Sequence, residues 1–245
     1  MTFAIALVVP VVTMLAQQPA AIAGGENVAE QIACAPLNPP APPLNGMRVS
    51  GGYQGRTMFG PGDALLINAG GRHGLQKGQR YFVRRYVADR FTPASLDFTP
   101  VSIHTAGWVT IVDTRDDDAV AQVTHACDGI LEGDYLEPYT DPVVPEPAPG
   151  GTADYDHPAR IVMGDQRMQT GAAGTLMLIN RGSDHGVRAG QTLTIFRATL
   201  KGHGPLADVG EATILSVRPQ TSLMRIDSSR DAVYVGDLAA IRRLP

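Results

Sequence analysis

The sequence predicts an all-β protein, in which a proline-rich linker joins two tandem small antiparallel β-barrel repeats. Three observations lead to this fold class. One motif occurs twice, short strand-like patterns alternate with glycine-rich turns, and a proline-dense stretch separates the two copies. Each copy is long enough to bury one small hydrophobic core.

The duplication is the strongest of these observations. Residues 66–79 match residues 178–191 without a gap, 112 positions further along the chain. The match then continues with an offset of 103, which pairs the closing Asp134 with Asp237. Because the two constant offsets differ by nine, repeat one carries a single insertion of nine residues, between Arg85 and Ala106.

These matches and the composition give the expected organisation. In chain order it is a signal peptide (1–23), a proline-rich N-terminal arm (24–45), β-barrel repeat one (46–139), a proline-rich acidic linker (140–157) and β-barrel repeat two (158–245). Proline-rich segments favour extended backbone, so we expect a semi-rigid linker.

The N-terminal residues predict export. The apolar run 3–15 is shorter than the roughly 20 residues that cross a bilayer, and it lies where a signal peptide has its apolar region. The small residues Ala21 and Ala23 suit cleavage before Gly24. We therefore expect a Sec-type signal, a periplasmic or secreted protein and no transmembrane segment in the mature chain. The alternatives are a buried apolar N-terminal segment and, less favoured, a lipoprotein leader ending at Cys34.

The chain has two cysteines, Cys34 and Cys127. In an exported protein this even, minimal count predicts a disulfide, here between the arm and the last hairpin of repeat one. Closing so long a loop would stabilise the fold by roughly 4–5 kcal/mol. Repeat two has Ser228 near the corresponding place, so the bridge is not part of the repeated module. Two free buried thiols are the alternative.

Repeat two contains six strand-like segments rich in aliphatic and β-branched residues, several of which alternate apolar and polar positions. They are residues 160–162, 175–179, 192–196, 212–217, 222–226 and 238–241. No segment shows a capped helical stripe. Six short strands favour a small antiparallel barrel, whose closure also removes exposed sheet edges.

The residues that the two copies share are turn formers. Glycines four apart suit positive φ or close backbone approach, and asparagine suits a strand exit. We assign structural turn roles to Asn68, Gly70, Gly74 and Gly78 and to their counterparts Asn180, Gly182, Gly186 and Gly190.

Two features found only in repeat one are candidates for partner binding. The inserted segment carries Phe91, Leu96 and Phe98, which either cover an open barrel end or form an exposed apolar patch. A basic stretch that includes Arg80, Arg84 and Arg85 is either a solvated face or a contact for an anionic glycan or lipid surface.

No group of residues predicts catalysis, a metal site or a cofactor. Ser183, Asp184 and His185 are consecutive turn residues, which cannot converge as a catalytic triad does. His73 and His185 share one turn position and lack neighbouring ligands. The acidic residues 116–118 lack the glycine and distal glutamate of a calcium loop, so a solvated turn is favoured over weak calcium binding.

The core motif resembles a β module of envelope proteins: Asn-x-Gly-x-x-x-Gly-Val/Leu-x-x-Gly-Gln, a strand, a glycine-led hairpin and a closing Gly-Asp. It is similar to the C-terminal domain of flagellar assembly protein T and to β domains of some lysin-motif peptidoglycan-binding proteins. A similar phrase occurs in the barrels of rod shape-determining protein C. His73 and His185 stand where these families usually have Asp. The resemblance implies assembly and scaffolding roles, and it transfers no active-site residues.

Together these observations predict a non-catalytic exported binding or assembly module of the cell envelope. An envelope protein is the expected partner, bound through the Phe91–Phe98 segment or the linker. The alternative is an anionic glycan- or peptidoglycan-associated protein. A net charge of −4 argues against nucleic acid, which requires a basic face. Since the insertion, the cysteine and the basic stretch all fall in repeat one, function is expected there.

Overall fold

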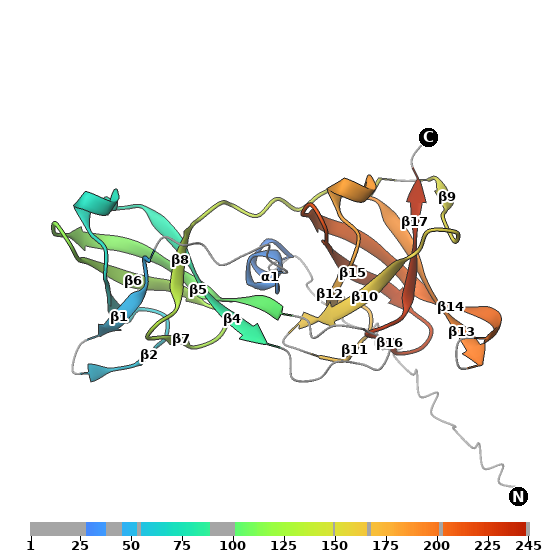
Figure 1. Ribbon diagram of the computed structural model, residues 1–245, viewed down its shortest axis with the longest axis horizontal. Coiled ribbons are helices and arrows are strands. Elements are labelled where there is room, and N and C mark those ends of the chain that lie inside the picture. Colours follow the sequence, from blue (N-terminus) through green and yellow to red (C-terminus); the bar gives the residue numbers. More distant parts are fainter. Residues whose placement is uncertain are drawn as a thin grey trace, which may run out of the picture.

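The computed structural model describes residues 28–37, 46–52, 55–88, 101–148, 150–165, 168–200 and 203–243. It is mostly β, with two β bodies and one short helix, α1 (Val28–Cys34), between them (Figure 1). The expected signal peptide (1–23) and the inserted Phe91, Leu96 and Phe98 lie outside the described residues.

Body one corresponds to repeat one. Its strands are β1 (Val49–Gly52), β2 (Met58–Phe59), β3 (Ala64–Ile67), β4 (Arg80–Ala88), β5 (Val101–Thr114), β6 (Ala119–Ala126), β7 (Ile130–Leu131) and β8 (Tyr135–Pro138). Six of them form a curled sheet in the order β1-β3-β6-β5-β4-β8, and β2 pairs with β7. A 3-10 turn, η2 (Gly71–His73), follows β3.

Body two corresponds to repeat two. Its strands are β9 (Thr152–Ala153), β10 (Ala159–Gly164), β11 (Thr170–Gly171), β12 (Leu176–Ile179), β13 (Thr192–Leu200), β14 (His203–Val217), β15 (Ser222–Ser229), β16 (Val233–Tyr234) and β17 (Leu238–Arg243). The order β10-β12-β15-β14-β13-β17 closes into a barrel because β10 also pairs with β17. The second 3-10 turn is η4 (Ser183–His185).

The expectation of two full barrels is therefore wrong for body one. There the two end strands meet at a single bridge, Arg48 with Tyr135, where β10 and β17 form a two-residue ladder. The difference lies in the first strand. β10 begins at Ala159, which pairs with Ala239, whereas β1 begins only at Val49. Met47, the counterpart of Ala159, contributes one backbone bond, which its oxygen accepts from the Leu136 N–H at 2.9 Å.

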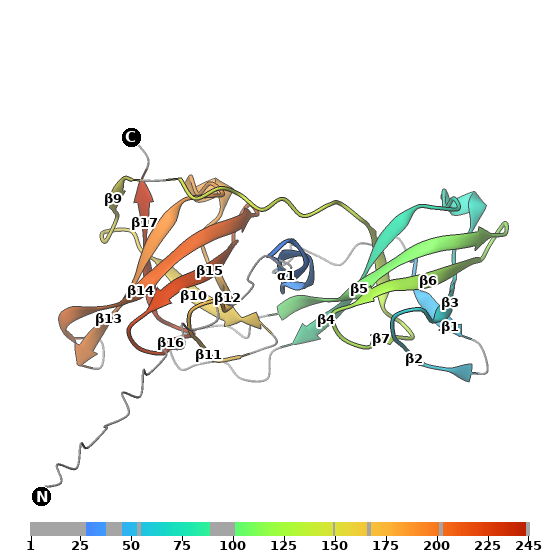
Figure 2. The same ribbon diagram turned by 180° about the vertical axis from the view of Figure 1, so that it is seen from behind.

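All six strands predicted in repeat two are present, as β10, β12, β13, β14, β15 and β17. The hairpin β13–β14 is longer than the apolar pattern indicated. It points away from body one, whereas the equivalent hairpin β4–β5 points toward body two (Figures 1 and 2). The two bodies therefore have the same orientation along the long axis of the molecule (Figure 1).

The insertion lies at the end of the hairpin β4–β5. By the two offsets, the strand ends Leu200 and His203 of body two correspond to positions 88 and 100 of body one. The added residues therefore connect β4 to β5, within the predicted interval between Arg85 and Ala106.

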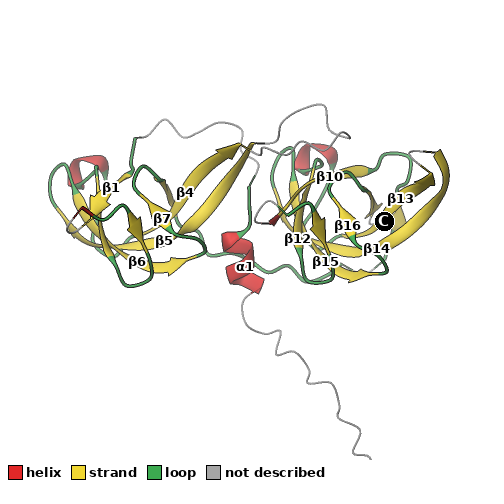
Figure 3. Cartoon of the chain, turned by 90° about the horizontal axis from the view of Figure 1, so that it is seen from below, coloured by secondary structure: helices red, strands yellow, loops and turns green. Residues whose placement is uncertain are grey.

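The helix α1, which the sequence analysis did not predict, contacts both bodies (Figures 2 and 3). Its Ala33 packs with Phe82 and Trp108 of body one. Val28 and Ile32 pack against the core of body two, to which the following Ala35 belongs. A helix of seven residues is marginal in water, so this packing is what stabilises it.

The predicted disulfide between Cys34 and Cys127 is confirmed. It joins the end of α1 to the turn after β6, and its Cα atoms are 5.5 Å apart. Disulfides persist in oxidising compartments, so the bond suggests an extracytoplasmic location. Among the described residues, no helix has the length and apolar content required to cross a membrane.

Candidate functional site

Residues that the two repeats share lie at the turns. Asn68 Oδ1 accepts the backbone N–H of Arg48 at 2.7 Å, and Asn180 Oδ1 accepts that of Arg160 at the same distance. A Cβ on Gly70 would collide with the backbone oxygen of Arg115. The backbone of both copies therefore requires these residue types.

The paired histidines are also turn residues. His73 Nδ1 accepts the backbone N–H of Gly70 at 3.2 Å, and His185 Nδ1 accepts that of Gly182 at 3.2 Å. The glycine after each histidine has φ near +80°, a conformation that other residues rarely adopt. Ser183, Asp184 and His185 form one 3-10 turn, as their adjacency implied.

A buried carboxylate repeats in the same way. Asp134 accepts two bonds from Arg85, at 2.7 and 2.8 Å, and the backbone N–H of Leu131 at 2.8 Å. Its counterpart Asp237 accepts Arg197 Nη2 at 2.8 Å and the Tyr234 N–H at 2.8 Å. Arg85 thus belongs to a pair that both bodies use for structure.

The basic stretch of β4 does not form one solvated face. Arg84 is buried, with its Nε 2.9 Å from Glu137 Oε2, and burial lowers the pKa of its guanidinium while the Glu137 charge opposes that shift. Arg80 pairs with Asp141 at 3.0 Å. Successive strand residues point to opposite sides, so Arg84 and Arg85 cannot share a face.

The acidic turn after β5 is exposed and ion-paired. Arg72 lies 3.0 Å from an Asp116 oxygen and 3.1 Å from one of Asp117. Most of each side chain is in solvent, in agreement with the favoured interpretation of this turn.

Beneath α1 lies a group found only in body one, the aromatic set of Phe82, Trp108, Tyr139 and His125. Phe82 and Tyr139 have ring centroids 4.5 Å apart, and Trp108 stacks on His125 at 4.2 Å with an interplanar angle of 13°. Ala33 of α1 packs on Phe82 and Trp108. The aromatic set is the part of body one that receives the arm.

Body two has a polar set at the equivalent positions: Thr194, Glu211, Ser228 and Arg242. Arg242 Nη2 lies 3.1 Å from Glu211 Oε1, and Thr194 Oγ1 donates to the same oxygen at 3.1 Å. No helix among the described residues packs there. The two copies therefore differ in chemistry at this surface, where body one has aromatic residues and body two has an ion pair.

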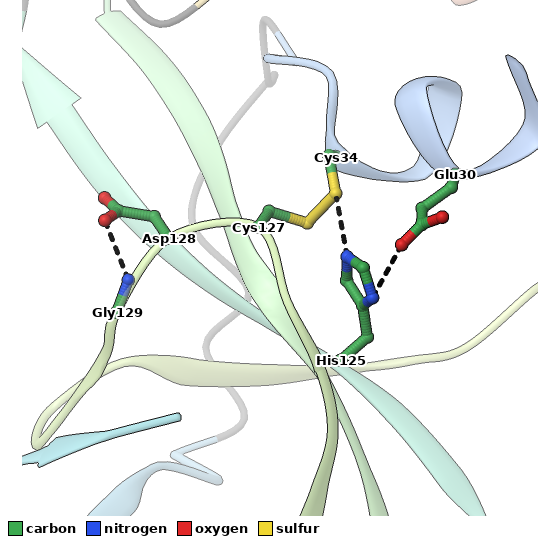
Figure 4. Close-up of a disulfide and its surroundings, with 6 residues drawn as sticks. All are labelled: Glu30, Cys34, His125, Cys127, Asp128 and Gly129. Carbon is green, nitrogen blue, oxygen red and sulfur yellow. Dashed lines mark hydrogen bonds and ion pairs between the residues drawn. A yellow bond between two sulfur atoms is a disulfide. The ribbon is translucent and has the colours of Figure 1, made fainter. Parts of the chain in front are cut away.

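The disulfide adjoins a histidine and a carboxylate (Figure 4). His125 Nδ1 lies 2.6 Å from Glu30 Oε1, and its Nε2 lies 3.8 Å from Cys34 Sγ. Cys34, Cys127 and His125 are each half-buried. We call this cluster of sulfur, imidazole and carboxylate the cysteine–histidine site. Among the described residues, Cys34, His125 and Cys127 are the one group of three or more such side chains whose ligand atoms lie close enough to hold a metal ion.

A second candidate is a basic cleft of about 500 Å³ on body two. Arg181, Arg188 and Arg243 line it together with His157 and Asp154. Asp154 pairs with Arg243 and, at 3.5 Å, with His157 Nδ1. Within the described ranges, no ion pair involves Arg181 or Arg188, so the cleft keeps positive charge that an anion could neutralise.

Neither site was predicted from the sequence, although the sequence contains a pattern that indicates each of them. Glu30 and Cys34 are four apart, hence on one face of a helix, and His125 and Cys127 are two apart, hence on one face of a strand. For the cleft, the aligned phrases differ where body two has Arg181 and Arg188 and body one has uncharged residues.

Comparison of the sequence with protein-family models and with curated proteins finds no match. The fold class therefore rests on the structure. The resemblance to envelope β modules rests on the duplicated motif and remains a prediction.

Proposed function

We propose that this chain is a non-catalytic, exported protein of the cell envelope, periplasmic or secreted, that binds a partner protein during assembly. One observation carries the proposal: a disulfide fixes α1 to body one while Val28 and Ile32 pack on body two. Two β bodies held by one shared helix suit a spacer or scaffold. The resemblance to envelope assembly modules supports the same function.

The linker offers a recognition segment between the bodies. Val143 and Val144 are 77% and 46% exposed and lie between Pro142 and Pro145. Exposed adjacent apolar side chains are typical of contact sites, and flanking prolines reduce the entropy lost on binding. The inserted Phe91, Leu96 and Phe98 remain a second predicted recognition element.

The test uses the oxidised full chain, crosslinked in envelope extracts, with the captured proteins identified by mass spectrometry. The double variant Val143→Ser/Val144→Ser should lose at least about tenfold of a specific crosslinked partner, since it removes apolar contact area. Leu206→Ser is the matched control, because Leu206 is 55% exposed but lies on β14. Equal capture by the linker variant and the wild type would contradict the linker as the recognition segment.

The alternative function is binding of an anionic glycan, and the basic cleft specifically favours it. Carboxylate-bearing sugars match guanidinium groups, which can donate two parallel hydrogen bonds. Unlike the arginines of β4, Arg181 and Arg188 have no carboxylate partner among the described residues.

Cosedimentation with purified peptidoglycan at low and high salt separates the two functions. If the cleft binds glycan, Arg181→Gln/Arg188→Gln should abolish the salt-sensitive fraction, whereas the exposed Arg72→Gln in body one should retain it. No cosedimentation of the wild type at low salt would exclude this alternative and leave the protein-binding proposal standing.

A further inference from the structure

We propose that the cysteine–histidine site is a zinc site when its disulfide is reduced, with Cys34, Cys127 and His125 as ligands. A metal ion would then replace the covalent bond as the link between α1 and body one. The inference is independent of the partner that the protein binds.

The positions of the ligand atoms carry the proposal. One ligand atom from each of the three residues lies within 4.8 Å of the others, and Cys34 Sγ is 3.8 Å from His125 Nε2. With Zn–S of about 2.3 Å and Zn–N of about 2.0 Å, tetrahedral ligands lie roughly 3.5 Å apart. Once the S–S bond opens, rotation of the cysteine side chains can bring both sulfurs to such distances.

The imidazole is already oriented as a ligand. Glu30 Oε1 lies 2.6 Å from His125 Nδ1, so the ring directs an N–H toward this carboxylate. In the neutral ring, the lone pair of Nε2 then faces Cys34. Zinc-bound histidines usually make this same bond to a carboxylate, which fixes the ring and its tautomer. The stacked Trp108 ring restrains the imidazole plane.

The site is reachable from solvent. A cavity of about 250 Å³ is lined by Cys34, Cys127 and Asp128. The Asp128 carboxylate accepts the Gly129 backbone N–H at 2.7 Å. Three protein ligands leave the fourth tetrahedral position to water, as in open zinc sites.

The reaction needs a reductant, which we identify by class as a dithiol. The two sulfurs of the dithiol form a new disulfide as the bond between Cys34 and Cys127 breaks. The two hydrogens of the dithiol pass to Cys34 and Cys127, which become thiols. Zinc binding then releases two protons to solvent, because thiolates are the ligands. Two sulfurs and one imidazole favour zinc over the harder magnesium and calcium ions.

Body two provides an internal contrast. The positions that correspond to His125 and Cys127 hold Ser228 and Arg230, and the described residues of body two include no cysteine. Any zinc bound with thiolate ligands must therefore bind at body one.

The experiment titrates zinc into the full chain, oxidised and then reduced with a phosphine, by calorimetry. We expect one equivalent to bind the reduced protein and none the oxidised protein at the same site. Cobalt should give thiolate charge-transfer absorption with the d–d bands of a tetrahedral site. Glu30→Gln should weaken zinc binding by roughly 10–100-fold while the cobalt spectrum keeps its form.

Two variants keep the proposal open to refutation. His125→Gln should weaken zinc binding at least about tenfold, whereas His157→Gln, in body two, should match the wild type. Binding unchanged in His125→Gln, equal binding by oxidised protein, or no binding by reduced protein would each overturn the assignment. Far-ultraviolet circular dichroism checks that each variant is folded, because Trp108 stacks on His125 and its fluorescence would change in His125→Gln even in folded protein.

Discussion

At the scale of single residues, each body has one buried aspartate, Asp134 or Asp237, that binds both an arginine and a backbone N–H near the last strand. Asp134 is 3% exposed and its partner Arg85 keeps 27% of its side-chain exposure. Removing one member of a buried ion pair leaves the other uncompensated, which typically costs about 3–5 kcal/mol. The partial exposure of Arg85 places the expected loss near the lower end.

We therefore expect Asp134→Ala to lower the free energy of unfolding of body one by about 3 kcal/mol. The single tryptophan, Trp108, lies in body one, so its fluorescence in urea follows that body. Asp237→Ala makes the same change in body two. It should shift the circular dichroism transition and leave the Trp108 midpoint closer to the wild type. A Trp108 midpoint that Asp237→Ala moves as much as Asp134→Ala would contradict this assignment.

The turn residues could be predicted from sequence because the second copy repeats the same residue types at the same spacing. Their contacts are not local, since Asn68 accepts the backbone N–H of Arg48, 20 residues away, and Gly70 packs on the backbone of Arg115. The meeting of His125 with Cys34 could not be predicted, because it depends on where a short arm packs after folding. Arg84 illustrates the same limit, since its burial depends on β8, fifty residues away in the chain.

At the scale of elements, the strands could be predicted from their own residues, whereas the helix α1 could not. The four residues of β12 are all buried and aliphatic or Met, so a short apolar run was enough to predict a strand. α1 has seven residues, and packing on both bodies determines its conformation. Closure of the barrel depends on whether the first strand begins early enough to pair with the last, which no periodicity reveals.

The bond between α1 and the turn after β6 should stabilise body one in the oxidised protein. Cys34→Ser/Cys127→Ser should lower the free energy of unfolding by up to about 4–5 kcal/mol, since the unfolded chain loses a constraint on its loop. Urea unfolding followed by Trp108 fluorescence measures the change. The control is reduced wild type without metal, whose free energy of unfolding should match that of the double variant. If the double variant kept the stability of the oxidised wild type while the reduced wild type lost it, the loop constraint would not explain the stabilisation.

At the scale of the whole molecule, α1 determines how the two bodies are held. Val28 and Ile32 provide its apolar contact with body two, and the disulfide provides its bond to body one. Interfaces between domains of one chain permit relative motion unless they are large and apolar. These two side chains are therefore expected to limit that motion.

The double variant Val28→Ser/Ile32→Ser should loosen the arrangement without unfolding either body. Small-angle X-ray scattering should show a larger radius of gyration, while the Trp108 unfolding midpoint stays near that of the wild type. Gln31→Ser is the matched control, because Gln31 is exposed on the same helix. A radius of gyration that neither variant changes would show that the linker alone holds the bodies.

The polar set of body two has a consequence for self-association. If the arm left its own body, α1 could occupy the aromatic set of a neighbouring molecule. It could not settle over Glu211 and Arg242, because covering that ion pair with apolar residues would remove its hydration. Exchange of arms can therefore take place only at the aromatic set of body one. When two molecules exchange arms reciprocally, both arms and both aromatic sets are occupied, so the complex closes as a dimer.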